Sequence, residues 1–237
     1  MHASVPTAPS WIAALPTDGR GFPIPAEAIW DGDVPQIEKG DAARTALLIV
    51  NSACAVCGRA LIVGRSVYRA FSQRDAAEIR LNEREIATDV NGPTHLSCIL
   101  YSTFACPYLA QPKAQLGADT MYAERGRRGT RPAVLGFEGY SLLVPPGAQP
   151  PLAGFNNLVE DLPYRAPQDL FSRYEHAVEE EASWLDGAPA HYWGAGTDQA
   201  ALLDEAQTKV LQFARSARST EILRNGWPVQ MLQRPGN

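Results

Sequence analysis

The chain has 237 residues, 45% hydrophobic and 20% charged, which is the composition of an ordinary globular protein. Its net charge of −5 argues against a dedicated binder of duplex DNA, whose affinity comes from neutralising phosphates. No apolar run approaches the roughly 20 residues that cross a bilayer, and the segment 1–14 lacks the basic and apolar regions of a secretory signal. We therefore expect a cytoplasmic protein with no membrane segment, in which thiols stay reduced.

The first segment, residues 1–44, is predicted to be a proline-rich extended arm that packs on the body. Its prolines forbid a long helix, and apolar residues such as Trp11 and Trp30 can anchor it. The prolines are Pro6, Pro9, Pro16, Pro23, Pro25 and Pro35. An apolar stretch at 46–50 then leads into the first cysteines.

Cys54 and Cys57 have the C-x-x-C spacing with which two thiolates reach one tetrahedral metal ion. The tight turn between them needs a residue that tolerates positive φ after the second cysteine, and Gly58 meets that need. Residues 59–63 and 66–71, separated by Gly64-Arg65, are predicted to pair as a β-hairpin. A charged, exposed helix is predicted at 75–86, and the chain breaks at 90–93.

A second pair of ligands follows the break. Thr94 is predicted to cap a helix that runs from His95 to about Phe104, and Cys106-Pro107 ends it. Residues at i and i+3 lie on one face of a helix, so His95 and Cys98 project together from its first turn. A helix N-terminus also stabilises thiolate charge.

We therefore predict that Cys54, Cys57, His95 and Cys98 form one closed, structural zinc site. Two other interpretations stay open, an incidental C-x-x-C pair beside a core histidine and a redox pair of thioredoxin type. Cys106 is a further candidate, interpreted as a buried free thiol, as a fourth ligand in place of His95, as a ligand of a metal cluster, or as a Cys-Pro haem ligand.

The second half of the chain carries no such constellation. Four arginines lie close together, at Arg125, Arg127, Arg128 and Arg131, and either form a solvated loop or bind an anion bidentately. One or two strands are predicted at 134–144, and two amphipathic helices, at 168–186 and 198–219, close the chain. These helices are candidates for homo-oligomerisation. Glu179-Glu180-Glu181 is interpreted as a solvated helical face.

These elements predict an α+β fold with three parts: the arm at 1–44, a zinc-binding module at 45–120 and an α+β region at 121–237 that forms one globular unit with the module. Cys54 to Leu61 together with His95 and Cys98 resembles treble-clef zinc modules, which implies a knuckle, a hairpin and a helix. The stretches 11–25 and 92–109 resemble a group of uncharacterised actinobacterial proteins, and that resemblance implies no activity.

Because a closed site lacks an open metal position, the sequence favours a binding or interaction role, toward an anionic partner through the arginines. The alternative is a metal- or haem-dependent enzyme with a pocket between the metal module and the C-terminal region. The sequence alone does not decide whether the protein is an enzyme.

Overall fold

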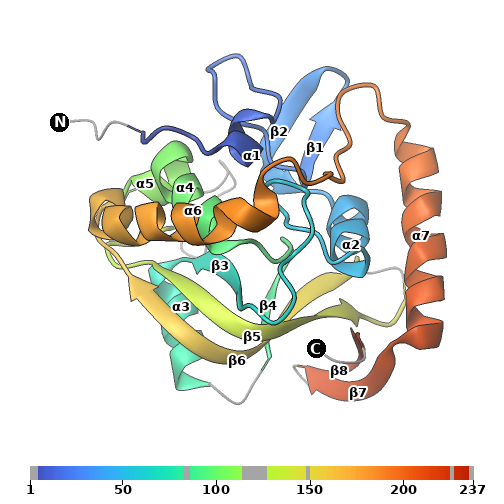
Figure 1. The fold of residues 1–237 in the computed structure, drawn as a ribbon. Coiled ribbons are helices and arrows are strands. Elements are labelled where there is room, and N and C mark those ends of the chain that lie inside the picture. The colour runs from blue at the N-terminus through green and yellow to red at the C-terminus, as the bar shows by residue number, and fades with distance from the viewer. Residues whose placement is uncertain (1–4, 83–85, 114–126, 148–149, 225–226, 235–237) are drawn as a thin grey trace.

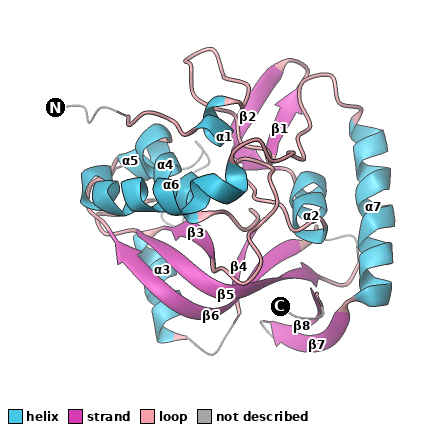
Figure 2. Ribbon diagram, in the orientation of Figure 1, coloured by secondary structure: helices cyan, strands magenta, loops and turns pink. Residues whose placement is uncertain are grey.

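The computed structural model describes residues 5–82, 86–113, 127–147, 150–224 and 227–234, which fold into a mixed α/β arrangement (Figures 1 and 2). The helices are α1 (Ser10–Ala13), α2 (Ala42–Val50), α3 (Gln73–Leu81), α4 (Leu96–Ala105), α5 (Pro107–Ala110), the 3-10 turn η2 (Pro167–Leu170), α6 (Phe171–Leu185) and α7 (Gln199–Ser216). The strands are β1 (Ala28–Asp31), β2 (Val34–Gly40), β3 (Val67–Phe71), β4 (Ala87–Asp89), β5 (Ala133–Val144), β6 (Leu152–Pro163), β7 (Arg218–Arg224) and β8 (Trp227–Gln233). Within these ranges, no helix has both the length and the apolar character needed to traverse a bilayer.

One antiparallel sheet is built around the long strands β5 and β6. β6 also pairs with β4. On its other edge β5 pairs first with β3 and then with β8, which in turn pairs with β7. β5 has 12 residues, so it is long enough to take two partners along one edge. β1 and β2 form a separate two-stranded sheet.

Two layers of helices cover this sheet (Figure 1). α2 and α4 pack directly on it, and they are buried along most of their length. The amphipathic helices α6 and α7 form the outer layer, with α6 on α4 and α7 on α2. α4 thus lies between the sheet and α6.

The main hydrophobic core combines residues from near both ends of the described chain with residues from its middle. It contains Trp11 and Ile12 from α1, Leu100 from α4, Phe155 from β6 and Leu232 from β8. The predicted arm therefore contributes core residues, and it also holds the β1–β2 pair, which the sequence analysis did not foresee. The prediction of three parts remains a prediction.

The predicted hairpin of residues 59–63 and 66–71 is not formed. The backbone around residue 60 bonds instead to the segment before Cys54, since Cys54 N–H donates to the carbonyl of Arg59 and Leu61 N–H donates to the carbonyl of Ser52. β3 takes β5 as its partner. The first stretch thus pairs with the segment just before it in sequence, and the second pairs with a distant strand.

Several boundaries also differ from the predictions. α3 begins earlier than expected because the Ser72 hydroxyl accepts the Asp75 amide as an N-cap, and the helix ends at Leu81. The last predicted helix stops at Ser216, and β7 and β8 follow it, so the chain does not close on two helices. The predicted strand region at 134–144 is β5.

Candidate metal centre

The cysteine pair sits in a tight knuckle of the backbone. Gly58 N–H donates to the carbonyl of Cys54 at 2.8 Å, and Gly58 has the positive φ, +69°, that the sequence predicts. An antiparallel β-bridge between the backbones of Ala53 and Ala60 closes the base of the knuckle. Ala55 N–H donates to the carbonyl of Pro93 at 2.8 Å, so the knuckle is tied directly to the segment that carries the second ligand pair.

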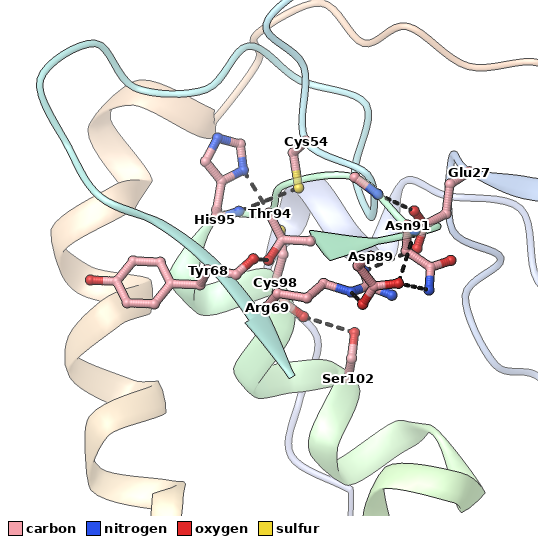
Figure 3. Close-up of polar contacts among 11 residues, drawn as sticks. Glu27, Cys54, Tyr68, Arg69, Asp89, Asn91, Thr94, His95, Cys98 and Ser102 are labelled. Atoms are coloured by element: carbon pink, nitrogen blue, oxygen red, sulfur yellow. Dashed lines mark hydrogen bonds and ion pairs between the residues drawn. The ribbon is translucent and has the colours of Figure 1, made fainter. Parts of the chain in front are cut away.

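His95 and Cys98 lie at the start of α4, as predicted, although the capping differs. His95 is itself the N-cap residue, and Thr94 donates its hydroxyl to the carbonyl of Tyr68 at 2.6 Å instead (Figure 3). The cap comes from α6: the Glu181 carboxylate accepts the amides of Leu96 and Ser97, each at 3.1 Å.

The four predicted ligands meet in one buried cluster. Their candidate donor atoms all lie within 4.8 Å of one another, and Cys54, Cys57, His95 and Cys98 are all buried. Nδ1 of His95 is 3.4 Å from Sγ of Cys57 and 3.8 Å from Sγ of Cys98. A tetrahedral zinc ion, with bonds of about 2.3 Å to sulfur and 2.0 Å to nitrogen, separates these two atom types by about 3.5 Å. The cluster could therefore hold a metal ion.

The orientation of the His95 ring suits metal binding through Nδ1. Nε2 lies 2.9 Å from the carbonyl oxygen of Ala60, an acceptor that requires the proton to be on Nε2. The lone pair of a neutral imidazole is then on Nδ1, which faces the sulfur atoms. Such a hydrogen bond on the far nitrogen is the usual way in which proteins fix a metal-ligating histidine.

The electrostatics of the cluster also call for a cation. Burial raises the pKa of Cys98 well above its usual value, and hydrogen bonds with Cys54 and Cys57 raise it further. Burial also acts to raise the pKa of Cys54, but hydrogen bonds from the other thiols and the charge of His95 hold it well below its usual value. Burial acts to lower the pKa of His95, but the charge of Cys54 and hydrogen bonds with Cys54 and Cys57 raise it well above its usual value. Without an ion the cluster therefore favours one thiolate at Cys54 beside a protonated His95, and charge on all three sulfurs with a neutral imidazole needs a bound cation.

A buried polar network orders the loop before His95 (Figure 3). Arg69 on β3 pairs with Glu27 at 3.1 Å and with Asp89 at 3.3 Å. Glu27 also accepts the Gly92 amide at 2.9 Å, and Asp89 accepts the Asn91 amide at 3.0 Å. Burial raises the pKa of Glu27, and the charge of Arg69 opposes that rise. The network fixes the loop that delivers His95 to the cluster.

Sequence reasoning missed the supporting residues. Glu27 lies in the predicted arm, and Glu181 lies in a run of acids that was interpreted as solvated. That interpretation is wrong for Glu181, whose carboxylate caps α4. No sequence signal pointed to Glu181, because Thr94 offered a local cap and only the fold places His95 at the N-cap position.

Glu181→Ala is expected to lower the free energy of unfolding by about 1–3 kcal/mol, because two amides at the buried start of α4 lose their acceptor. Glu180→Ala is the matched control: Glu180 is 38% exposed and only pairs with Arg173 and His176, so its loss should cost less than about 1 kcal/mol. Urea unfolding of the two variants beside the wild type measures both. Equal effects of the two substitutions would contradict the capping role.

Cys106 lies outside the cluster. It is the C-cap residue of α4, whereas Cys98 lies in the first turn of the same helix. Its side chain is partly exposed, and the three cysteines of the cluster are fully buried. The fold thus brings together the ligand set with His95, and not the alternative set in which Cys106 replaces it.

The fold gives different environments to the arginines that were predicted to bind an anion together. Arg125 lies outside the described residues, while Arg127 and Arg131 are exposed. Arg128 is fully buried, and its guanidinium donates to the carbonyls of Leu109, Gly129 and Arg165 at 2.7, 3.1 and 3.1 Å. It also lies over the Tyr164 ring. Arg128 is therefore occupied inside the protein and does not face an external anion.

Arg128→Met is expected to destabilise the fold by about 3 kcal/mol or more, since three buried carbonyls lose a charged donor. Arg131→Met, at an exposed position in the same segment, should change the unfolding free energy by less than about 0.5 kcal/mol. Thermal or urea unfolding gives both values. A mild effect at Arg128 would show that its carbonyl bonds are dispensable.

A small cavity lies between the metal centre and α6, the location that the enzyme alternative requires. Its volume is about 150 Å³, and Tyr68, Leu96, Glu181 and Trp184 are among the residues that line it. Binding sites for drug-sized ligands usually measure about 300–1,000 Å³. A cofactor as large as haem exceeds this space.

The chain was also compared with family models, with curated proteins and with solved structures, and none of the three comparisons finds a match. The resemblances to treble-clef modules and to actinobacterial proteins therefore remain predictions. The knuckle and the helix of a treble clef are present, but the hairpin that should stand between them is not.

Proposed function

We propose that Cys54, Cys57, His95 and Cys98 hold a structural zinc ion. The observation that carries the proposal is the convergence of four buried donor atoms within 4.8 Å, from two distant parts of the chain. Three thiolates and one imidazole are a donor set typical of zinc. In the cytoplasm, where we place the protein, these thiols stay reduced.

The zinc ion acts as a clamp in this proposal. The knuckle is attached to the N-terminal segment through the amides of Ala26 and Glu27, which donate to the carbonyls of Val56 and Ala55. α4 belongs to the central layer of the fold. Four protein ligands leave no open position for substrate, so the ion supports a binding protein and not metal catalysis.

Zinc content tests this proposal directly. The protein, purified without chelator, should contain one zinc ion per chain by elemental analysis. Replacing the zinc with cobalt should give the visible and thiolate charge-transfer absorption bands of a tetrahedral site with three sulfur ligands. A protein that contains no stoichiometric metal, or a cobalt spectrum of six-coordinate type, would overturn the proposal.

We propose that the binding role is toward an anionic partner. The site for this partner is a shallow hollow that is lined by both Arg131 and Arg165. The hollow has a volume of about 250 Å³ and is also lined by Pro163, Tyr164 and Asp169. Asp169 accepts the amides of Arg165 and Ala166, and these bonds lower its pKa. Both guanidinium groups are on exposed residues. This hollow replaces the predicted site around Arg128.

Titration with inorganic phosphate and with a phosphorylated peptide tests this role. Calorimetry should detect binding that weakens with salt and is lost in the double variant Arg131→Gln with Arg165→Gln. Arg127→Gln, at an exposed position outside the hollow, is the control. Equal binding by the double variant and the control would exclude the hollow as the anion site.

A further inference from the structure

The outer face of α7 is more apolar than a solvent-exposed helix requires. α7 faces the body with Leu202 and Ala206, which are buried. Leu203 and Leu211 are on another face and are 52% and 64% exposed. Figure 1 shows α7 at the right-hand edge of the molecule, beside α2. Two exposed leucines one above the other on a helix mark a surface that another helix can cover.

The exposed stripe has the same order in both directions. It consists of Leu203, Gln207 and Leu211, each four positions apart, with the exposed Ala200 before them; Ala214, the matching position after them, is partly buried against the core. If a second α7 packs against it in the antiparallel sense, Leu203 of one copy meets Leu211 of the other. The two Gln207 side chains face each other at the centre. An amide both donates and accepts, so two copies of Gln207 can bond to each other.

The charges of α7 are divided about the same centre. Asp204 and Glu205 precede Gln207, and Lys209 and Arg215 follow it; these are all the charged residues of α7. Asp204 and Arg215 flank the stripe on the same side, so an antiparallel pair brings Asp204 of one helix toward Arg215 of the other, whereas Glu205 and Lys209 lie on the opposite side of the helix from the stripe. A parallel pair brings like charges together, which is unfavourable.

We propose that two copies of this chain associate through α7, antiparallel about a two-fold axis at Gln207. Such an isologous contact closes on itself and gives a dimer. α7 has 18 residues and is about 27 Å long, so one helix from each copy makes a small interface. The dimer therefore dissociates on dilution.

Sedimentation equilibrium of the zinc-loaded full chain over a range of concentrations tests the association. The wild type should shift from monomer to dimer as concentration rises, whereas Leu211→Glu should stay monomeric. Gln212→Glu adds the same charge at the next, exposed position outside the stripe and should dimerise like the wild type. Circular dichroism checks that both variants are folded. A wild type that stays monomeric, or a Leu211→Glu protein that still dimerises, overturns the proposal.

Disulfide trapping tests the orientation, in a Cys106→Ser background that removes the partly exposed thiol. Packed helices 8–10 Å apart bring facing Cα atoms within disulfide reach. Mixing Leu203→Cys protein with Leu211→Cys protein should give the mixed disulfide under mild oxidation, and neither protein alone should cross-link. Cross-linking of Leu203→Cys to itself would show a parallel pair. Absence of the mixed disulfide would likewise refute the antiparallel arrangement.

Discussion

Cys57→Ser is expected to release the metal ion and to lower the free energy of unfolding by several kcal/mol. Binding of a structural zinc ion is worth about 10–16 kcal/mol at neutral pH, and that free energy stabilises the folded chain. Cys57 is fully buried, so no water-exposed group can take its place at the ion. Elemental analysis measures the zinc content, and urea unfolding measures the stability.

Cys106→Ser is the matched control for this substitution. It removes a thiol that lies at the other end of α4 and outside the cluster. The Cys106→Ser protein should therefore keep one zinc ion and unfold at nearly the same urea concentration as the wild type. Unchanged zinc in Cys57→Ser, or loss of zinc in Cys106→Ser, would show that the ligand set is wrong.

The two pairs of candidate ligands were predictable because the residues of each pair lie close together in the sequence. Cys54 and Cys57 lie three positions apart around a turn that ends in Gly58, and His95 and Cys98 lie three positions apart at a helix start. Local spacing fixes the direction of such side chains almost independently of the rest of the fold. The meeting of the two pairs was inferred from chemistry, since a tetrahedral ion needs four donors.

The partners of the strands were not predictable in the same way. The hairpin expected at 59–71 rests on a local turn at Gly64. Instead, β3 pairs with the long central strand β5 of the sheet. This choice depends on β5, which follows β3 by more than 60 positions. Tertiary context decides strand pairing more strongly than local pattern does.

One local signal was overlooked near the end of the chain. Asn225-Gly226 is the dipeptide most typical of a tight β-hairpin turn, and it stands between β7 and β8. The preceding amphipathic pattern led the predicted helix through Ser219 instead. Glu181 is a different kind of omission, because only the packing of α6 on α4 brings its carboxylate to the helix start.

Gly58→Ala is expected to destabilise the protein by roughly 3–5 kcal/mol, which is more than a positive φ alone explains. Gly58 has a φ of +69°, and a β-carbon there would overlap the backbone carbonyl of His191. His191 N–H donates to the carbonyl of Gly58 at 2.7 Å, and the backbones of Arg59 and Ala190 form an antiparallel β-bridge. The substitution therefore separates the knuckle from the segment that follows α6.

Gly64→Ala supplies the control for conformational strain. Gly64 has a similar φ, +76°, but a β-carbon there would meet nothing within 4 Å. Its substitution should cost about 1 kcal/mol, the penalty of the left-handed conformation. Urea unfolding of both variants at several zinc concentrations separates the causes. The proposed site binds zinc only in the folded state, so added zinc should recover part of the stability of Gly58→Ala by mass action. Equal losses in the two variants would mean that the contact with His191 contributes nothing, and that the metal ligands alone hold the knuckle in place.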